Sequence, residues 1–376
     1  MKSAYIHIPF CEHICHYCDF NKFFIDGQPV DEYLDMLLKE MEITIAENCP
    51  TTPLSTIFVG GGTPTALNEH QLKKLCEGIR TFLPFEDGEF TFEANPGDLS
   101  KEKLHILRSF GVNRLRFGVQ AFNDQLLTRI GRTHRVDDVY VSIDQALSVG
   151  FKNISIDLIY RLPGQTEEDF AKTLELALEL QLPHYSVYSL IVEPKTIFYN
   201  LMSKGKLSLP SEDNEAEMYK LAMQEMERKG LKQYEISNFA IPGYESKHNL
   251  TYWNNEEYYG FGAGAHAYVD GTRKSNYGPL KKYMEPLKNN KLPTYESHIV
   301  TNREKMEEEI FLGLRKNKGV HLNHFNQKYG RDIFSVFAKP IETMQAKGLL
   351  QISDGYLRLT SVGKFLGNEV FQAFLH

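Results

Sequence analysis

The first half of the chain alternates short β-rich runs with amphipathic stretches, and this alternation constrains the fold most. The β-rich runs lie at Ala4–Ile8, Thr56–Val59, Glu89–Glu93, Arg114–Val119, Asn153–Leu158 and His184–Leu190. Apolar residues recur at helical spacing in Asp31–Ala46, Glu69–Phe82, Lys101–Phe110, Val136–Val149 and Glu167–Leu180. Strands that alternate with helices of this length predict a parallel sheet with crossover helices. We expect N-caps at Asn68, Ser100, Asp137 and Thr166.

Six such units predict an α/β fold, a partial (β/α)6 TIM-like barrel, rather than the eight units of a closed barrel. A doubly wound open sheet is the alternative that periodicity leaves open. Parallel barrels place their chemistry at the carboxyl ends of the strands. The polar or unusual residues at these ends are Cys11, the turn Gly60–Pro64, Glu93, Gln120 and Asp157.

Cys11, Cys15 and Cys18 follow the first predicted strand with the spacing C-x3-C-x2-C. Three thiolates on one tight loop can hold three irons of a [4Fe–4S] cluster. The fourth iron would then lack a protein ligand and be free to bind a small molecule.

A zinc site is the main alternative, because His7, His13 or His16 could supply a fourth ligand. The chain has no second cysteine pair, since Cys49 and Cys76 stand alone. Inert thiols are a further alternative. A disulfide framework is disfavoured in a chain of 376 residues with five cysteines and no secretory leader.

The composition is that of an ordinary globular protein, with 42% hydrophobic and 24% charged residues. A net charge of −7 argues against general nucleic-acid binding. No apolar run is long enough to span a bilayer, and the first residues do not resemble a targeting peptide. Free thiols at an oxygen-sensitive site fit a reducing compartment, so we expect a cytoplasmic protein.

The pattern changes near Thr301, and we predict a domain over residues 1–290 and a second one over 301–376. The second reads as helices, a tight hairpin and a last helix, the outline of a winged-helix unit. Its predicted elements are Met306–Leu314, His321–Tyr329, Ile333–Lys347, the strands Leu349–Ile352 and Tyr356–Leu359, and Val362–Phe374. From Thr301 onward, 11 Lys and Arg against 8 Asp and Glu give +3, too little to favour DNA binding.

Two further features suit a ligand. The turn Gly60–Pro64 lacks the Gly-Lys-Ser/Thr ending of a phosphate loop, but its glycines allow a ligand to approach the backbone closely. Glu93 is a carboxylate at the end of an apolar strand, which is unfavourable without a partner. A ligand ammonium or ribose hydroxyl would satisfy it, and so would a salt bridge to Arg116.

The segment His248–Trp253 contains the only tryptophan of the chain. A single histidine among aromatic residues is usually a hydrogen-bonded core residue. Such a segment can also bind a flat aromatic ligand, with the histidine as the axial ligand of a haem iron.

The C-x3-C-x2-C motif, with Tyr17 just before the last cysteine, resembles the signature of the radical S-adenosylmethionine (SAM) superfamily. That resemblance implies a [4Fe–4S] cluster whose open iron is chelated by the amino and carboxylate groups of SAM. In the family the reduced cluster passes an electron into the sulfonium, and a C–S bond breaks to give a 5′-deoxyadenosyl radical.

Nearly the whole chain resembles the branch around oxygen-independent coproporphyrinogen III oxidase, and within it the haem chaperones. The oxidase pattern continues to a further cysteine where this chain has Phe20, and the oxidase carries a longer segment before its cluster loop. The pattern His-Asn-x-x-Tyr-Trp at His248–Trp253 is typical of the chaperones.

By this resemblance, Cys11, Cys15 and Cys18 would hold the cluster. The implied SAM contacts are Tyr5 and Tyr17 along the site, Gly61, Gly62 and Thr63 at the amino end, and Glu93, Gln120, Arg132 and Asp157 as polar partners. His248 would be a ligand of haem.

The resemblance therefore implies a haem chaperone that binds a [4Fe–4S] cluster, SAM and haem and passes haem to acceptors such as respiratory enzymes. Such a protein would need an electron donor for its cluster and would not bind nucleic acid. The resemblance is compatible with a homodimer and with peripheral contact to a membrane. Oxidative decarboxylation of coproporphyrinogen III is the alternative function. A zinc-stabilised binding module is the third.

Overall fold

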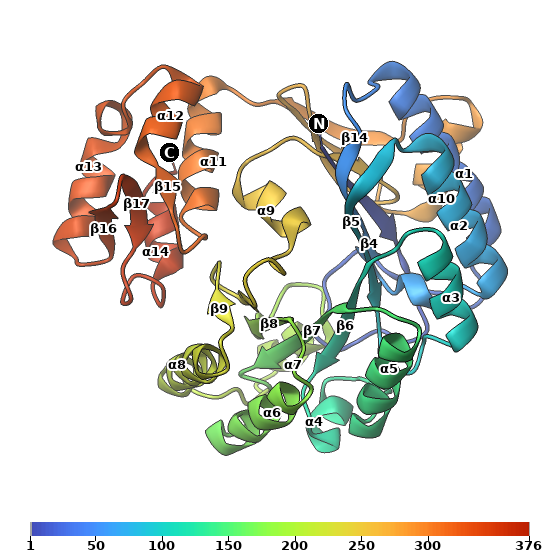
Figure 1. Ribbon diagram of the computed structural model, residues 1–376, viewed down its shortest axis with the longest axis horizontal. Helices are drawn as coiled ribbons and strands as arrows, with labels where there is room; N and C mark the ends of the chain where they lie inside the picture. The colour runs from blue at the N-terminus through green and yellow to red at the C-terminus, as the bar shows by residue number, and fades with distance from the viewer. Residues whose placement is uncertain (1, 376) are drawn as a thin grey trace.

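The computed structural model describes residues 2–375. A nine-stranded sheet with the order β11-β1-β4-β5-β6-β7-β8-β10-β9 curves around one side of the molecule (Figure 1). Its six central strands are parallel and consecutive, which confirms the predicted partial barrel. They are β1 (Ser3–Ile8), β4 (Leu54–Gly61), β5 (Phe85–Ala94), β6 (Arg114–Gln120), β7 (Asn153–Tyr160) and β8 (His184–Ser189).

The predicted crossover helices are confirmed and cover the convex face of this sheet (Figure 1). They are α1 (Val30–Glu47), α2 (Glu69–Phe82), α3 (Lys101–Ser109), α5 (Val136–Ser148) and α6 (Glu167–Glu179), with a short α4 (Asp124–Arg129) before α5. The large apolar core lies between these helices and the sheet.

Three of the four predicted N-caps accept a hydrogen bond from their helix: Asn68, Ser100 and Thr166. The prediction of Asp137 was wrong, because the cap residue of α5 is Arg135 and Asp137 lies in the first turn. The carboxylate of Asp138 accepts from the backbone N–H of Arg135 at 2.7 Å. The carboxylate of Asp124, from α4, accepts from the N–H of Val136 at 2.9 Å, so α5 begins at Val136 as predicted and its cap lies two residues before Asp137.

The sheet is extended at both edges by short strands that the sequence did not indicate. At one edge β11 (Tyr259–Phe261) pairs parallel to β1. At the other, β10 (Asn238–Ala240) pairs antiparallel to β8 and to β9 (Lys232–Gln233). The helix α9 (Lys247–Trp253) lies between these edges, on the open side of the partial barrel (Figure 1).

The remaining elements of this part support its edges. The cysteine segment runs between β2 (Phe10–Cys11) and β3 (Phe23–Phe24), which pair with one another. The turn after β4 continues into the 3-10 helix η1 (Pro64–Ala66). The others are α7 (Ile197–Ser203), α8 (Glu212–Arg228), α10 (Leu280–Lys288) and the antiparallel strands β12 (His266–Val269), β13 (Thr272–Asn276) and β14 (Thr294–Ile299).

The C-terminal part has a hydrophobic core of its own. Its helices are α11 (Asn302–Gly313), α12 (Leu322–Tyr329) and α13 (Ile333–Ala346). They pack with a small sheet of β15 (Val320–His321), β17 (Tyr356–Leu359) and β16 (Leu350–Ser353). The predicted hairpin is present, with β15 added to it.

The last predicted helix, Val362–Phe374, is wrong in extent, because α14 covers only Gly367–Gln372. Residue Leu366 has φ −113° and ψ 27°, which is not helical. Before it, the chain turns tightly against the sheet, and a Cβ at Gly363 would lie 2.0 Å from the carbonyl oxygen of Leu349. Among the described residues, no helix is both long enough and apolar enough to cross a membrane.

Candidate functional site

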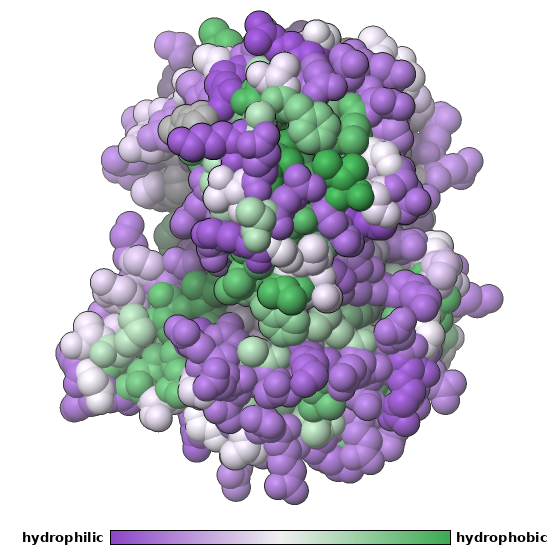
Figure 2. Space-filling model, turned by 90° about the vertical axis from the view of Figure 1, so that its left-hand side faces the viewer, coloured by the Kyte–Doolittle hydropathy of each residue, from purple (hydrophilic) through white to green (hydrophobic). Residues whose placement is uncertain are grey.

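A cavity of about 1350 Å³ opens at the carboxyl ends of the parallel strands and extends to the C-terminal part. Figure 2 shows a waist between an upper and a lower lobe, with hydrophobic surface on both sides of it. Small-molecule pockets usually measure roughly 300–1,000 Å³. This cavity therefore has room for more than one ligand.

Most of the predicted site residues line this cavity, although they come from the ends of four strands and from two loops. The lining includes Cys11, Cys15, Tyr17, Cys18, Gly61, Gly62, Thr63, Glu93, Gln120, Arg132 and Asp157. Tyr5 and His248 are not part of it.

The cysteine loop is fixed by backbone hydrogen bonds at its base and its middle. The N–H of Ile25 donates to the carbonyl of Cys11 at 2.9 Å, and the N–H of His16 donates to the carbonyl of Ile130 at 3.0 Å. Within the loop, the N–H of Cys18 donates to the carbonyl of Cys15 at 3.3 Å. The three thiols are thereby held on one side of the cavity.

The thiols form a donor set suited to a cluster. Burial raises the pKa of Cys11 to about 11 and also raises the pKa of Cys18, and each neighbouring thiolate adds to the shift. Coordination to a metal removes such protons, because the metal's charge stabilises the thiolate. In residues 2–375 no group of three His, Cys, Asp or Glu side chains is arranged to hold one metal ion. Three cysteines on one loop beside the cavity are a donor set that fits a cluster with one open iron.

The glycine turn after β4 lies directly beside this loop. The N–H of Gly62 donates to the carbonyl of Ile8 at 2.9 Å, and the N–H of Thr63 donates to the carbonyl of Phe10 at 2.7 Å. Gly61 has φ +113°, and a Cβ there would lie 2.4 Å from the ring of His7. A Cβ at Gly62 would lie 2.7 Å from the carbonyl oxygen of Phe10. The turn thus requires glycine, and it lines the cavity without side chains at Gly61 and Gly62.

A chain of polar contacts connects the turn to the far side of the cysteine loop. The hydroxyl of Thr63 donates to the sulfur of Cys11 at 3.7 Å and accepts from the amide of Asn95 at 3.0 Å. Arg132 donates to the Asn95 oxygen at 2.6 Å and to the Tyr17 hydroxyl at 2.9 Å. The Nε of Arg132 is buried without a hydrogen-bond partner. Arg132 lines the cavity, so an anionic ligand group bound there would be near this unused donor.

Glu93, Arg116 and Asp157 form one layer across three adjacent strands. Both oxygens of Asp157 accept from the Nε of Arg116 at 2.8 Å, and an oxygen of Glu93 lies 3.7 Å from its Nη1. Glu93 also accepts from the N–H of Gly61 at 3.1 Å. The salt bridge and the ligand-binding role considered for Glu93 are therefore compatible. Burial raises the pKa of Glu93, and Arg116 opposes that shift.

Gln120 ends β6 in a conformation that a non-glycine residue rarely adopts, with φ +71°. The pairing with β7 shifts register between Gly118 and Gln120. The amide lies beside Gly118, where a Cβ would be 2.8 Å from its Nε2, and both residues line the cavity. Strain of this kind is found where the surrounding structure fixes a functional side chain.

Tyr5 lies one layer away from the lining. Its hydroxyl and Nδ1 of His7 are 2.9 Å apart. Burial and the nearby charge of Glu93 raise its pKa. Its predicted contact with SAM stays a prediction, while its observed contact is with His7.

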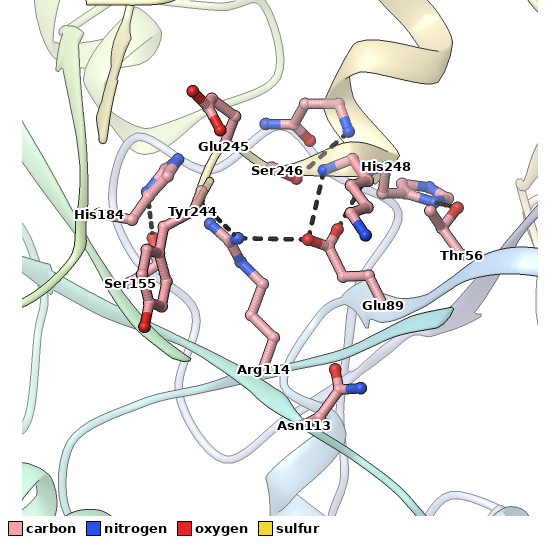
Figure 3. Close-up of polar contacts among 12 residues, drawn as sticks. Thr56, Glu89, Asn113, Arg114, Ser155, His184, Tyr244, Glu245, Ser246 and His248 are labelled. Carbon is pink, nitrogen blue, oxygen red and sulfur yellow. Dashed lines mark hydrogen bonds and ion pairs between the residues drawn. The ribbon is translucent and has the colours of Figure 1, made fainter. Parts of the chain in front are cut away.

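His248 also lies outside the cavity, in the polar cluster of Figure 3. Its Nδ1 is 2.9 Å from the hydroxyl of Thr56, and its Nε2 is 2.8 Å from the hydroxyl of Tyr252. Burial lowers its pKa to about 3. A haem iron could bind this imidazole only if one of these bonds broke. The geometry favours a positioning role, in which His248 fixes α9 while Tyr252 and Trp253 reach the cavity.

Sequence reasoning missed Asn95 as a partner of Arg132 and missed Tyr188, whose hydroxyl accepts from Arg116 at 2.7 Å. The sequence did indicate Arg116 as a partner of Glu93. It lies on the same face of β6 as Arg114 and Gly118, because residues two apart along a strand face the same side. No comparable signal exists for residues brought in from other elements.

Comparisons with known proteins agree with this geometry. The family model "Radical SAM superfamily" matches residues 5–177, and "HemN C-terminal domain" matches residues 300–366. A heme chaperone HemW from Bacillus subtilis is 57% identical, over 100% of this chain and 99% of the relative. A heme chaperone HemW from Lactococcus lactis is 46% identical, over 100% of this chain and 97% of the relative.

Among solved structures, the coproporphyrinogen III oxidase HemN from Escherichia coli, described as a radical SAM enzyme, is similar with a TM-score of 0.86. The alignment covers 99% of this chain and 90% of that one at 25% identity. The likeness includes the C-terminal part as well as the partial barrel.

Proposed function

The chain belongs to the family of HemW heme chaperones within the radical SAM superfamily, and on that premise we propose that it binds haem and transfers it to acceptor proteins. We further propose that it holds a [4Fe–4S] cluster and SAM at the carboxyl end of the barrel. The observation that carries this proposal is one cavity with a thiol-lined end and a second, partly apolar end.

At the first end, Cys11, Cys15 and Cys18 would ligate the cluster. The chemistry that a bound, reduced cluster and SAM supply is one-electron cleavage of the sulfonium. The glycine turn would admit the amino end of SAM to the backbone, and Glu93 would accept a hydrogen bond from its ammonium or ribose. The unpartnered Nε of Arg132 supports a contact with its carboxylate.

The polar partners have separate tasks in this proposal. Arg116 keeps Asp157 and Glu93 oriented through the contacts described above. Gln120 would present its amide to the nucleoside. Tyr17 closes the cysteine loop over the site through its bond to Arg132.

At the second end, exposed apolar side chains favour a flat apolar ligand. Ile191, Phe365 and Leu366 line the cavity and are at least 41% exposed. A haem would cover such surface, since burial of apolar area favours binding. We place the transfer in the cytoplasm, where thiols stay reduced, with respiratory enzymes as acceptors and a separate electron donor for the cluster. A homodimer is compatible with this proposal.

A haem titration of the anaerobically reconstituted protein tests the function. We expect a Soret band that saturates with haem. When an apo-haemoprotein is added as acceptor, the band should shift to that of the acceptor's haem-bound form. The absence of any Soret change on adding haem would remove the proposal.

Oxidative decarboxylation of coproporphyrinogen III is the second candidate, favoured by the likeness to HemN over 99% of this chain. Phe20 stands where the oxidases resembled by this chain have a further cysteine. An anaerobic assay with a fully loaded cluster, SAM and reductant decides between them. Formation of protoporphyrinogen with consumption of SAM would establish the second candidate.

A further inference from the structure

We propose that Arg315, stacked on Trp253, is the binding site for a propionate carboxylate of the haem. The site lies at the end of the cavity where the C-terminal part meets the partial barrel. This inference rests on the proposed function and names the group that orients the cargo.

Arg315 is fixed at the junction of the two parts of the molecule. It follows α11, and its carbonyl accepts from the N–H of Ile236 at 3.1 Å. The backbone of the next residue, Lys316, forms an isolated antiparallel β-bridge with that of Glu235. Its ammonium donates to the side-chain oxygen of Asn254 at 2.6 Å. The backbone that carries the guanidinium is therefore held on both sides of the junction.

The guanidinium itself contacts two aromatic rings. Its Cζ is 4.6 Å from the ring centroid of Trp253 and 5.7 Å from that of Phe371. Rings over its faces hold the group by cation–π contact and leave its edge, where the N–H groups lie, for a planar anion. In residues 2–375 no carboxylate forms an ion pair with Arg315.

Two buried donors at this corner lack partners. They are the Nε of Arg315 and the indole Nε1 of Trp253, and both residues line the cavity. Buried donors without partners are rare in folded proteins and are unfavourable unless a ligand or water binds them. Two N–H groups on stacked side chains suit an acceptor with two oxygens, such as a carboxylate.

Glu235, an acid near Arg315, does not bond to these donors. Glu235 is close enough to Arg315 for the cation to oppose the rise that burial causes in its pKa. Its carboxylate instead accepts from the N–H of Ser237 at 3.1 Å and from the amide of Asn238. The positive edge of Arg315 is thus left for a ligand.

The surroundings select an anion that carries a large apolar body. The exposed apolar residues Phe365 and Leu366 line the same end of the cavity. A second cation, Lys364, lines it as well and donates to the amide oxygen of Gln233 at 2.9 Å. A flat macrocycle with two propionates matches one apolar wall and two cations.

Haem and haem dimethyl ester, in which both propionates are neutral, test this site on the intact protein. We expect the wild type to bind the ester about tenfold to a hundredfold more weakly than haem, the range for loss of charged hydrogen bonds. Arg315→Gln should bind haem more weakly by a similar factor and lose most of its preference over the ester. Lys318→Gln, an equal charge change on an exposed neighbour outside the cavity, should behave as the wild type.

Three results would overturn the inference. One is a wild type that binds the ester as tightly as haem. Another is an Arg315→Gln variant that keeps the full preference for haem. The third is loss of the response to SAM instead of the affinity for haem in that variant, which would assign Arg315 to the SAM carboxylate. A wild type that binds no haem would remove the proposed function together with this site.

Arg315→Lys is a second, more conservative variant that tests the same site if Arg315→Gln fails to fold. It keeps the charge but lacks the planar group that stacks and donates from its edge. We expect an intermediate preference for haem over the ester, with an unchanged response of the cluster to SAM. A full wild-type preference in this variant would contradict recognition by the edge of the guanidinium.

Discussion

Two Glu–Arg pairs on the same two strands have different surroundings and, we infer, different tasks. Glu89 and Arg114 pair at the amino end of the barrel at 3.2 Å, with side chains only 6% and 2% exposed. Glu93 and Arg116 pair at the carboxyl end at 3.7 Å, with 27% and 16% exposed. Residue type and strand are the same, so the distinction lies in how completely each pair is enclosed.

The amino-end pair has enough partners within the protein, as Figure 3 shows. Glu89 accepts from the N–H of Lys247 at 3.2 Å and from the N–H of His248 at 3.1 Å. Arg114 donates to the carbonyl of Tyr244 at 3.0 Å. This pair fastens the start of α9 to the sheet, and the groups that bond to it come from the protein itself.

The carboxyl-end pair is shared with Asp157 and faces the cavity. Its carboxylates outnumber the cation between them, and burial raises the pKa of Glu93. A cationic or hydroxyl-bearing ligand would balance that layer. The site is therefore marked by a Glu–Arg pair at the carboxyl ends of the strands whose charges are not balanced within the protein, and a buried pair alone does not mark it.

The largest effect is expected at the cysteine loop beside the carboxyl-end pair. Cys15→Ser should abolish the cluster after anaerobic reconstitution, because the alcohol is a poor ligand for iron. Iron and sulfide analysis with visible absorbance measures this. Cys49→Ser, an exposed cysteine outside the loop, is the matched control and should keep the cluster. Full cluster content in the Cys15 variant would mean that Cys15 is not a ligand.

Breaking the amino-end pair should affect stability most. Arg114→Ala leaves Glu89 buried without its cation and is expected to lower the free energy of unfolding by about 3–5 kcal/mol. Arg116→Ala should lower it less, since its pair is more exposed. Urea unfolding of both variants compares them. Equal losses would show that the two pairs are structurally equivalent.

Breaking the carboxyl-end pair should affect the ligand instead. Glu93→Ala is expected to weaken SAM binding by about tenfold to a hundredfold while the cluster remains, because one charged hydrogen bond is lost. Isothermal titration of the reconstituted protein measures this. Glu86→Ala, on the exposed start of the same strand, is the control. An unchanged SAM affinity in the Glu93 variant would make this residue structural.

The smallest effect is expected at His248, which belongs to the amino-end cluster. His248→Phe leaves the hydroxyls of Thr56 and Tyr252 without a partner and should lower stability by about 1–3 kcal/mol. The Soret position of the bound haem should not move. A shift of that band would support the predicted role of His248 as a haem ligand.

The fold was largely predictable because its central strands and helices carry their own periodic patterns. The strands β10 and β11 were not, since each has three residues and exists through pairing with β8 or β1. The overlong helix at Val362–Phe374 has a related cause, because the close approach of Gly363 to Leu349 is a tertiary contact. Domain bounds at 290 and 301 stay a prediction.

The cysteine loop and the glycine turn were predictable because spacing within a few residues carries their chemistry. The partners that complete the site come from distant positions, such as Asn95, which lies 37 residues from Arg132. Arg315 and Trp253 likewise meet only when the C-terminal part packs on the barrel. Contacts of this kind depend on the folded chain and leave no local pattern.

The most direct test of the carboxyl-end site is EPR of the reduced, anaerobically reconstituted protein with and without SAM. The account predicts the spectrum of a [4Fe–4S]⁺ cluster that changes when SAM is added, because SAM would bind the iron that has no cysteine. A well-loaded cluster whose spectrum is the same with and without SAM would contradict it.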